Sequence, residues 1–87
     1  MATATGINLK NFGKEFKNRL SEDELTYALS YIDFGEERLA FETLCDYICE
    51  NDAVITKNEY EQIYMFNLLF NYPLENNVVI YLNNLIK

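Results

Sequence analysis

Residues 36–51 read EERLAFETLCDYICEN, and their apolar side chains recur every three or four positions. This spacing gathers the apolar side chains on one broad face of an α-helix, which must pack against other elements to leave water. The stretch therefore predicts a helix that ends near Asn51 and lies against the rest of the protein. Its apolar face consists of Leu39, Ala40, Phe41, Leu44, Cys45, Ile48 and Cys49.

A capping box, in which a Ser or Thr and a Glu three residues later bind each other's backbone N–H groups, stands on either side of this stretch. The first box, residues 21–24 (SEDE), starts a helix that we expect to end near Phe34, because Gly35 favours a helix stop. The second box, residues 56–59 (TKNE), starts a helix that must stop before Pro73. Beyond its first turns that helix is apolar nearly all round, which predicts a position at the centre of the fold.

The two ends of the chain complete the predicted architecture. An apolar stripe predicts a helix from Ile7 to about Leu20, and residues 1–6 are expected to form a flexible end. The spacing in residues 75–86 favours a helix, although the run Val-Val-Ile-Tyr leaves a strand open. We therefore expect an all-α protein, a compact bundle of four to five short helices, with residues 7–87 as a single domain.

Charge and composition restrict the classes of partner. The chain of 87 residues has 14 acidic and 7 basic side chains, which gives a net charge of −7. A field of this sign repels nucleic acid and anionic membranes and attracts a basic partner. No apolar run approaches the roughly 18 residues of a membrane span, and no signal peptide is evident, so a cytoplasmic location is expected.

Arrangements for catalysis or metal binding are not evident in the sequence. The chain has no histidine, and so lacks the commonest general base and the commonest metal ligand. Cys45 and Cys49 lie one turn apart on the predicted apolar face, where a disulfide has poor geometry and further soft ligands are lacking. We therefore expect buried thiols, no cofactor, no metal and no enzyme activity.

Acidic side chains are concentrated on the helix predicted from residues 36–51. Glu42, Asp46 and Glu50 are spaced by four and form one line along it, which we call the acidic ridge. Like charges at this spacing disfavour a helix by about 0.2–0.5 kcal/mol per pair. Arg38, one turn before Glu42, can offset the charge of Glu42 only.

The repulsion among the carboxylates of the ridge can be offset by cations of the same molecule or of another one. Lys10, Lys14 and Lys17 of the first segment are the internal source, and a cationic surface of another protein is the external one. The third interpretation is an ordinary solvated face. Tyr47 stands among the carboxylates, and tyrosine beside acids is a usual composition for a surface that binds Arg and Lys.

Several short segments resemble small bacterial immunity proteins. The segments are 19–25 (RLSEDEL), 31–36 (YIDFGE), 40–46 (AFETLCD), 50–52 (END) and 55–56 (IT). They are similar to the Maf-type immunity family, which pairs with Maf polymorphic toxins, and to proteins that accompany contact-dependent growth inhibition toxins. The resemblance covers about half of the chain.

The resemblance implies an antitoxin that binds and neutralises a cognate toxin, the C-terminal nuclease domain of a large secreted protein. An EndoU-like ribonuclease is the favoured toxin, and an acidic surface would block its basic RNA-binding groove or its active site. An acidic helical adaptor or regulator of another basic protein is the alternative, and a monomer or weak dimer is expected. The partner-binding residues expected from the ridge and the family segments together are Asp33, Glu36, Glu42, Asp46, Tyr47, Glu50 and Asp52.

Overall fold

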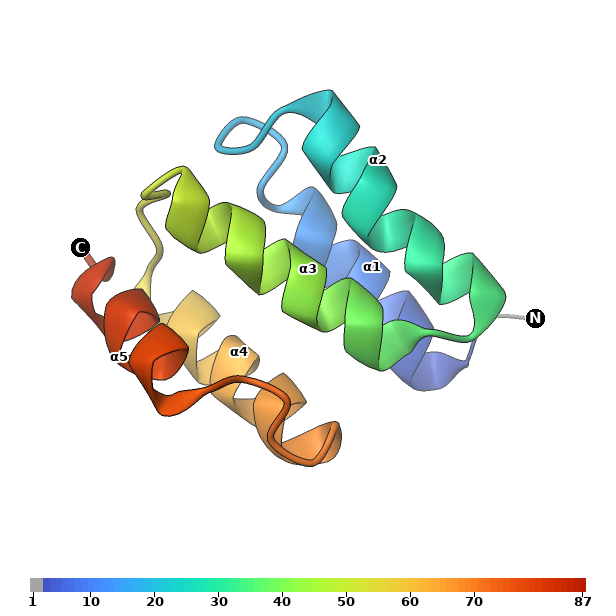
Figure 1. Cartoon of the computed structure of the whole chain (residues 1–87). Helices are drawn as coiled ribbons and strands as arrows, with labels where there is room; N and C mark the ends of the chain where they lie inside the picture. Colours follow the sequence, from blue (N-terminus) through green and yellow to red (C-terminus); the bar gives the residue numbers. More distant parts are fainter. Residues whose placement is uncertain (1–2) are drawn as a thin grey trace.

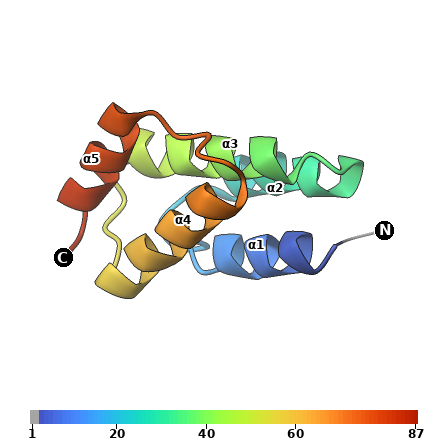
Figure 2. The same ribbon diagram turned by 90° about the horizontal axis from the view of Figure 1, so that it is seen from below.

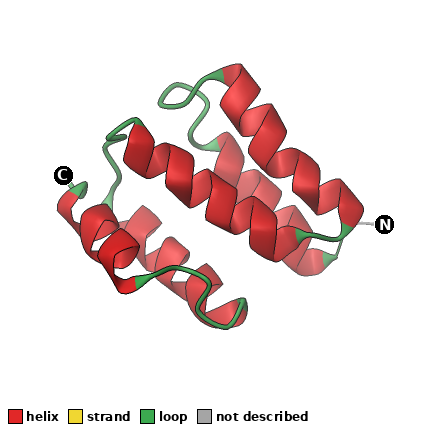
Figure 3. Ribbon diagram, viewed as in Figure 1, coloured by secondary structure: helices red, strands yellow, loops and turns green. Residues whose placement is uncertain are grey.

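The computed structural model describes residues 3–87, which form five α-helices and one 3₁₀ helix (Figure 1). The elements in chain order are α1 (Ala4–Lys14), α2 (Glu22–Ser30), η1 (Tyr31–Phe34), α3 (Glu37–Glu50), α4 (Lys57–Leu69) and α5 (Asn76–Asn84). Within residues 3–87 there is no strand, as Figure 3 shows, and the predicted all-α bundle is confirmed. In the same part of the chain, no helix has both the length and the apolar character needed to cross a membrane.

Helix α3 holds the bundle together, because it packs against α1, α2, η1 and α5 (Figure 1). The helix predicted from the stretch 36–51 is therefore confirmed, with two departures on its apolar face. Leu39 is 39% exposed and Cys49 is only half-buried. The side chains of α3 that no solvent reaches are Ala40, Phe41, Leu44, Cys45 and Ile48.

Four phenylalanines join α1, α3 and α4 into one core. The ring of Phe66 lies 5.7 Å from that of Phe12 and 5.9 Å from that of Phe41, measured between centroids. The ring of Phe70 stacks on Phe66 at 6.1 Å. Aromatic pairs at such separations add to the free energy gained from burial alone, so these contacts fix how α4 sits against the other helices.

Both predicted capping boxes are present. The Ser21 side chain accepts a hydrogen bond from the Glu24 N–H, and the Glu24 carboxylate accepts one from the Ser21 N–H. Thr56 and Glu59 make the same reciprocal pair at the start of α4. The helix stop predicted near Phe34 coincides with the end of η1, because Gly35 follows it with a left-handed φ of 73°. The α-helix α2 itself already ends at Ser30.

The N-terminal expectations are wrong for the described residues. Helix α1 begins at Ala4, not at Ile7, because the Thr3 hydroxyl caps it by accepting from the Gly6 N–H at 2.9 Å. The same hydroxyl donates to the Glu37 carboxylate at 3.1 Å, which ties the start of α1 to α3. The flexible end therefore does not include residues 3–6, and residues 1–2 of that prediction lie outside the described residues.

Helix α1 also ends earlier than the apolar stripe predicts. It stops at Lys14, and tighter turns follow in which Phe16 donates to the Gly13 carbonyl and Lys17 to the Lys14 carbonyl. Phe16 and Leu20 remain buried although they lie beyond the helix. The stripe therefore identifies core residues correctly, but the last of them reach the core from a turn.

Helix α4 does not occupy the centre of the fold, and that prediction is wrong. Only Ile63 and Asn67 of α4 are buried. Figure 2 shows α4 beside α1, crossing the side of the bundle away from α2. The central position belongs to α3, and α4 leaves four large apolar side chains exposed. The exposed large apolar side chains of α4 are Tyr64, Met65, Leu68 and Leu69, which are 46–62% exposed.

The C-terminal segment is the helix α5, so the alternative of a strand is wrong. The described chain contains one isolated β-bridge, which joins Ile55 and Ile86 in parallel. Ile55 donates to the Leu85 carbonyl at 3.1 Å, and the Lys87 N–H donates to the Ile55 carbonyl at 3.0 Å. These bonds fasten the end of the chain to the connection between α3 and α4.

Candidate functional site

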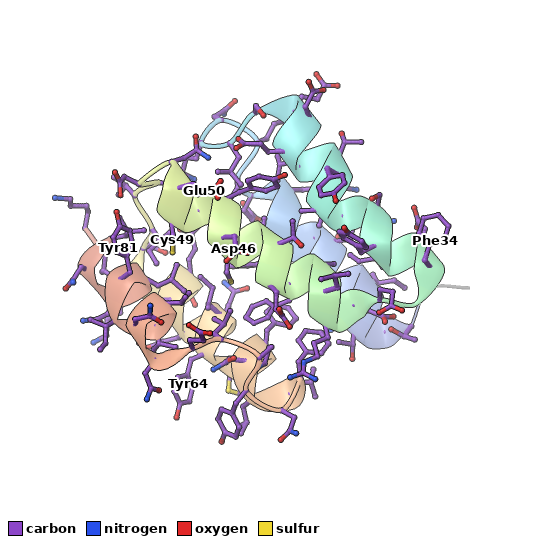
Figure 4. The ribbon with its side chains drawn as sticks, in the orientation of Figure 1. Phe34, Asp46, Cys49, Glu50, Tyr64 and Tyr81 are labelled. Carbon is purple, nitrogen blue, oxygen red and sulfur yellow. The ribbon has the colours of Figure 1, made fainter. Side chains whose placement is uncertain are left out.

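The acidic ridge lies on the solvent side of α3, as its spacing predicts. Asp46 and Glu50 are exposed and Glu42 is half-exposed. Figure 4 shows Asp46 along the middle of α3 and Glu50 near its C-terminal end. Glu50 is also the last residue of α3, where the negative end of the helix dipole disfavours a carboxylate.

Within the described chain, one ion pair offsets the negative charge of the ridge. The Arg38 Nε lies 3.7 Å from Oε1 of Glu42, an ion pair one turn apart on the exposed face. Among the described residues, no ion pair reaches Asp46 or Glu50. The negative charges of these two carboxylates are therefore balanced by solvent ions or by groups outside the described chain.

The lysines of the first segment do not neutralise the ridge, so that alternative is wrong. Lys10 pairs with Asp33 on η1, with 3.3 Å between Nζ and Oδ1. Lys14 and Lys17 line a shallow recess next to α2, together with apolar side chains such as Leu29. Within residues 3–87 no ion pair joins these lysines to Glu42, Asp46 or Glu50.

Partial burial acts on the carboxyl and thiol groups of α3. The pKa of Asp46 is raised because the surrounding protein removes part of its solvent. Burial, followed by the charge of Asp46, raises the pKa of the Cys49 thiol to about 11. Burial also raises the pKa of the Cys45 thiol well above its usual value. Both cysteines are free thiols, and at neutral pH both are protonated and poor nucleophiles.

Tyr47 lies beside two further tyrosines that the sequence interpretation missed. Tyr27 and Tyr31 of the α2–η1 segment meet edge to face at 5.4 Å, and their hydroxyls are 2.7 Å apart. The pKa of Tyr47 is raised by burial and by the neighbouring charges of Tyr27 and Glu24. We call Tyr27, Tyr31 and Tyr47 the tyrosine cluster. Its signal in the sequence is the spacing of Tyr27 and Tyr31 by four, off the apolar stripe of their helix.

Glu24 and Asn51 connect the tyrosine cluster to the end of the ridge. The Asn51 amide donates to the Glu24 carboxylate at 3.0 Å and to the Tyr47 carbonyl at 2.8 Å. Hydrogen bonds from the Ser21 backbone and from Asn51 lower the pKa of Glu24. The surface formed by α2 and α3 therefore offers fixed tyrosine rings next to ionised carboxylates.

The remaining predicted residues lie at the two ends of α3. Asp52 has a left-handed φ of 48° and accepts a hydrogen bond from the Tyr81 hydroxyl of α5. Asp33 and the exposed Glu36 are at the opposite end, before α3 begins. The structure thus brings Glu42, Asp46, Tyr47 and Glu50 onto one helix and separates Asp33 and Glu36 from Asp52 by the length of α3.

Phe34 is a further feature of the surface near the N-terminal end of α3. Its side chain is 79% exposed at the end of η1, next to Asp33 and near Glu36 (Figure 4). A side chain this exposed contributes little to the core. It extends the acidic surface at the N-terminal end of α3 with an apolar contact point.

Comparison with known proteins adds no relative: no family model, no curated protein and no solved structure matches this chain.

Proposed function

We propose that this protein is an immunity protein that binds a basic toxin domain through the acidic ridge and the tyrosine cluster. The observation that carries the binding mode is the pair Asp46 and Glu50, two exposed carboxylates on α3 without an ion-pair partner in the described chain. The class of partner is supported by the resemblance to Maf-type immunity proteins and by the net charge of −7.

The ridge and the cluster supply two complementary parts of an interface. Carboxylates pair with the Arg and Lys side chains of a basic partner and speed its approach. Tyrosine rings supply large rigid contact area, and tyrosine is enriched among the residues that carry most of the binding energy. Tyr27 and Tyr31 hold each other by their hydroxyl contact, so little side-chain freedom would be lost on binding.

Inhibition follows from charge if the partner is a nuclease. A ribonuclease, the EndoU-like class being favoured by the resemblance, must present cations where it holds RNA. A rigid helix that carries Glu42, Asp46 and Glu50 over about two turns would place negative charge in such a groove. RNA would then be excluded by occupation and by repulsion. We propose binding rather than catalysis because the chain has no histidine.

The experiment pairs this chain with the toxin domain encoded beside it. Affinity is measured by calorimetry at low and high salt, with the double variant Asp46→Lys, Glu50→Lys and the control Glu75→Lys, an exposed acid outside the ridge. We expect the double variant to weaken binding by about a hundredfold or more, because it places like charges together, and the control to bind as the parent does. Binding that is unaffected by the double variant contradicts the role of the ridge.

The alternative function is an acidic adaptor or regulator of a different basic protein, which the same unpaired carboxylates would serve. The two proposals differ in the partner alone. Loss of toxin activity on addition of this chain supports immunity. Capture of a basic protein that is unconnected with a toxin, through Asp46 and Glu50, supports the adaptor.

A further inference from the structure

A groove of about 870 Å³ lies between α1 and α4, and none of the predicted site residues lines it. Figure 2 shows the two helices side by side on the side of the bundle away from α2. The groove is large enough for a segment of secondary structure rather than for single side chains. Its walls combine apolar, amide and carboxylate side chains: Asn8, Asn11, Phe12, Glu15, Thr56, Asn58, Glu59, Glu61, Gln62, Met65, Phe66 and Leu69.

The apolar part of the groove belongs mainly to α4. Phe12 is buried and Phe66 half-buried, and their contact closes the bottom of the groove. Met65 and Leu69 stand one turn apart on the wall and are 62% and 61% exposed. Exposed apolar side chains that are adjacent on one helix mark an interaction surface more often than scattered ones do.

The charge of the groove has one sign. Glu15, Glu59 and Glu61 line it, and neither Lys nor Arg does. Arg19 pairs with Glu59 through two hydrogen bonds, and Glu15 and Glu61 are the groove acids that make no ion pair within the described chain. Glu15 also follows the last residue of α1, where the carbonyl end of the helix adds partial negative charge.

We propose that this groove binds a cationic amphipathic helix of a partner protein. The apolar face of such a helix would cover Met65 and Leu69, and its cations would face Glu15 and Glu61 on the two sides. The 13 residues of α4 span about 20 Å, which matches about four turns of a docked helix. The amide side chains on both walls, Asn8 and Asn11 against Asn58 and Gln62, supply donors and acceptors for its polar flanks.

A second copy of this chain fits the groove less well than a basic helix does. Among the described helices α4 carries the most exposed large apolar side chains, and as the occupant it would bring its own Glu59 and Glu61 into a groove that already holds acids. Like charges placed opposite each other disfavour association. The proposal also stands apart from the acidic ridge, so the two surfaces can be tested separately.

The test uses the full chain and a synthetic peptide of about 14 residues, with Leu on one face of its helix and Lys on the others. The matched peptide carries Glu in place of each Lys. In NMR spectra of the labelled protein, we expect the Lys peptide to shift the side-chain amide signals of Asn8, Asn11, Asn58 and Gln62, and the Glu peptide to leave them in place.

Variants then locate the contact. Met65→Ser with Leu69→Ser should weaken binding of the Lys peptide by about tenfold or more, since burial of these side chains is lost. Ile80→Ser, which alters an equally exposed apolar side chain on α5, is the matched control and should bind unchanged. Glu61→Lys should also weaken binding, whereas Glu75→Lys should not.

Three results overturn the proposal. The first is a set of shifts centred on Asp46 and Glu50 with the groove signals unmoved. The second is equal binding of the Lys and Glu peptides. The third is a stable dimer in sedimentation equilibrium that Met65→Ser with Leu69→Ser dissolves, because a second copy would then be the occupant.

Discussion

Arg19 and Glu59, forty residues apart, are joined by two parallel hydrogen bonds of 2.7 Å each. The same guanidinium donates to the carbonyls of Val54 and Glu15 and lies 4.1 Å above the ring of Phe16. Arg19 therefore links the exit of α1, the connection between α3 and α4, and the first turn of α4. A planar guanidinium suits this position because lysine cannot make the paired contact.

Removal of Arg19 should destabilise the protein more than removal of any exposed lysine. For Arg19→Met we expect a loss of about 1–2 kcal/mol in the free energy of unfolding, because Glu59 and the two carbonyls lose a charged donor. Lys10→Met, which breaks the more exposed pair with Asp33, is the control and should cost less than about 0.5 kcal/mol. Urea unfolding followed by circular dichroism measures both, and equal losses would contradict the assignment.

The Glu59 pair also predicts how stability depends on pH. Hydrogen bonding by Arg19 holds the pKa of Glu59 below its usual value. A depressed carboxyl pKa gives stability that is present above the unfolded pKa, about 4.3, and is lost as the pH falls through the folded pKa. We therefore expect Glu59→Gln to be less stable than the parent at pH 7 and the difference to shrink toward pH 3. A difference that stays constant with pH would show that the pair does not titrate in this way.

The sequence predicts Glu59 in one role and misses the other, for a physical reason. A capping box is local, and its two partners are three residues apart, so Thr56 and Glu59 can be recognised without a structure. Arg19 meets Glu59 only after α1, α3 and α4 have packed, and nothing in the spacing of charges reveals that. The same limit explains why the lysines of α1 stand as one possible source of cations for the ridge in the sequence, although Lys10 pairs with Asp33 in the structure.

The wrong prediction of a central position for α4 has a related cause. An apolar pattern indicates which face of a helix is apolar, but it does not indicate whether that face is covered by the same chain or by another molecule. For α3, other helices of the same chain cover the apolar face. The acids of the ridge share one side of α3 because residues spaced by four lie on the same face of any helix. For α4, Met65 and Leu69 remain exposed, so the pattern that suggested a central helix describes a surface.

The thiols of α3 should be slow to react. Cys49 has a pKa of about 11, so at pH 8 its thiolate fraction is roughly two orders of magnitude below that of an ordinary cysteine. Iodoacetamide should therefore label the folded protein very slowly at both Cys45 and Cys49, and quickly after denaturation in urea. Mass spectrometry over time distinguishes the two residues. Rapid labelling of Cys49 in the folded chain would contradict the burial that raises its pKa.

Asn67 should be the polar residue on which the turn between α4 and α5 depends. It is 6% exposed, and its side-chain oxygen accepts from the Leu74 N–H at 3.1 Å. Its own carbonyl accepts from Tyr72, which has a left-handed φ of 58°. Asn67→Ala should cost about 1–3 kcal/mol, because the Leu74 N–H loses its partner. Asn83→Ala, at an exposed asparagine, is the control, and an equal effect would contradict the prediction.

The acidic ridge should lower the free energy of unfolding of this protein. Asp46 and Glu50 repel each other one turn apart, and Glu50 ends α3 at the negative pole of its dipole, so Asp46→Asn and Glu50→Gln should each raise the free energy of unfolding by about 0.2–0.5 kcal/mol. Glu42→Gln, which loses the contact with Arg38, should give no gain. Urea unfolding at low salt measures these differences, and 1 M salt should remove them. If neutralising Asp46 or Glu50 instead destabilised the isolated chain, these carboxylates would serve the fold, and their availability to a basic partner would lose its support.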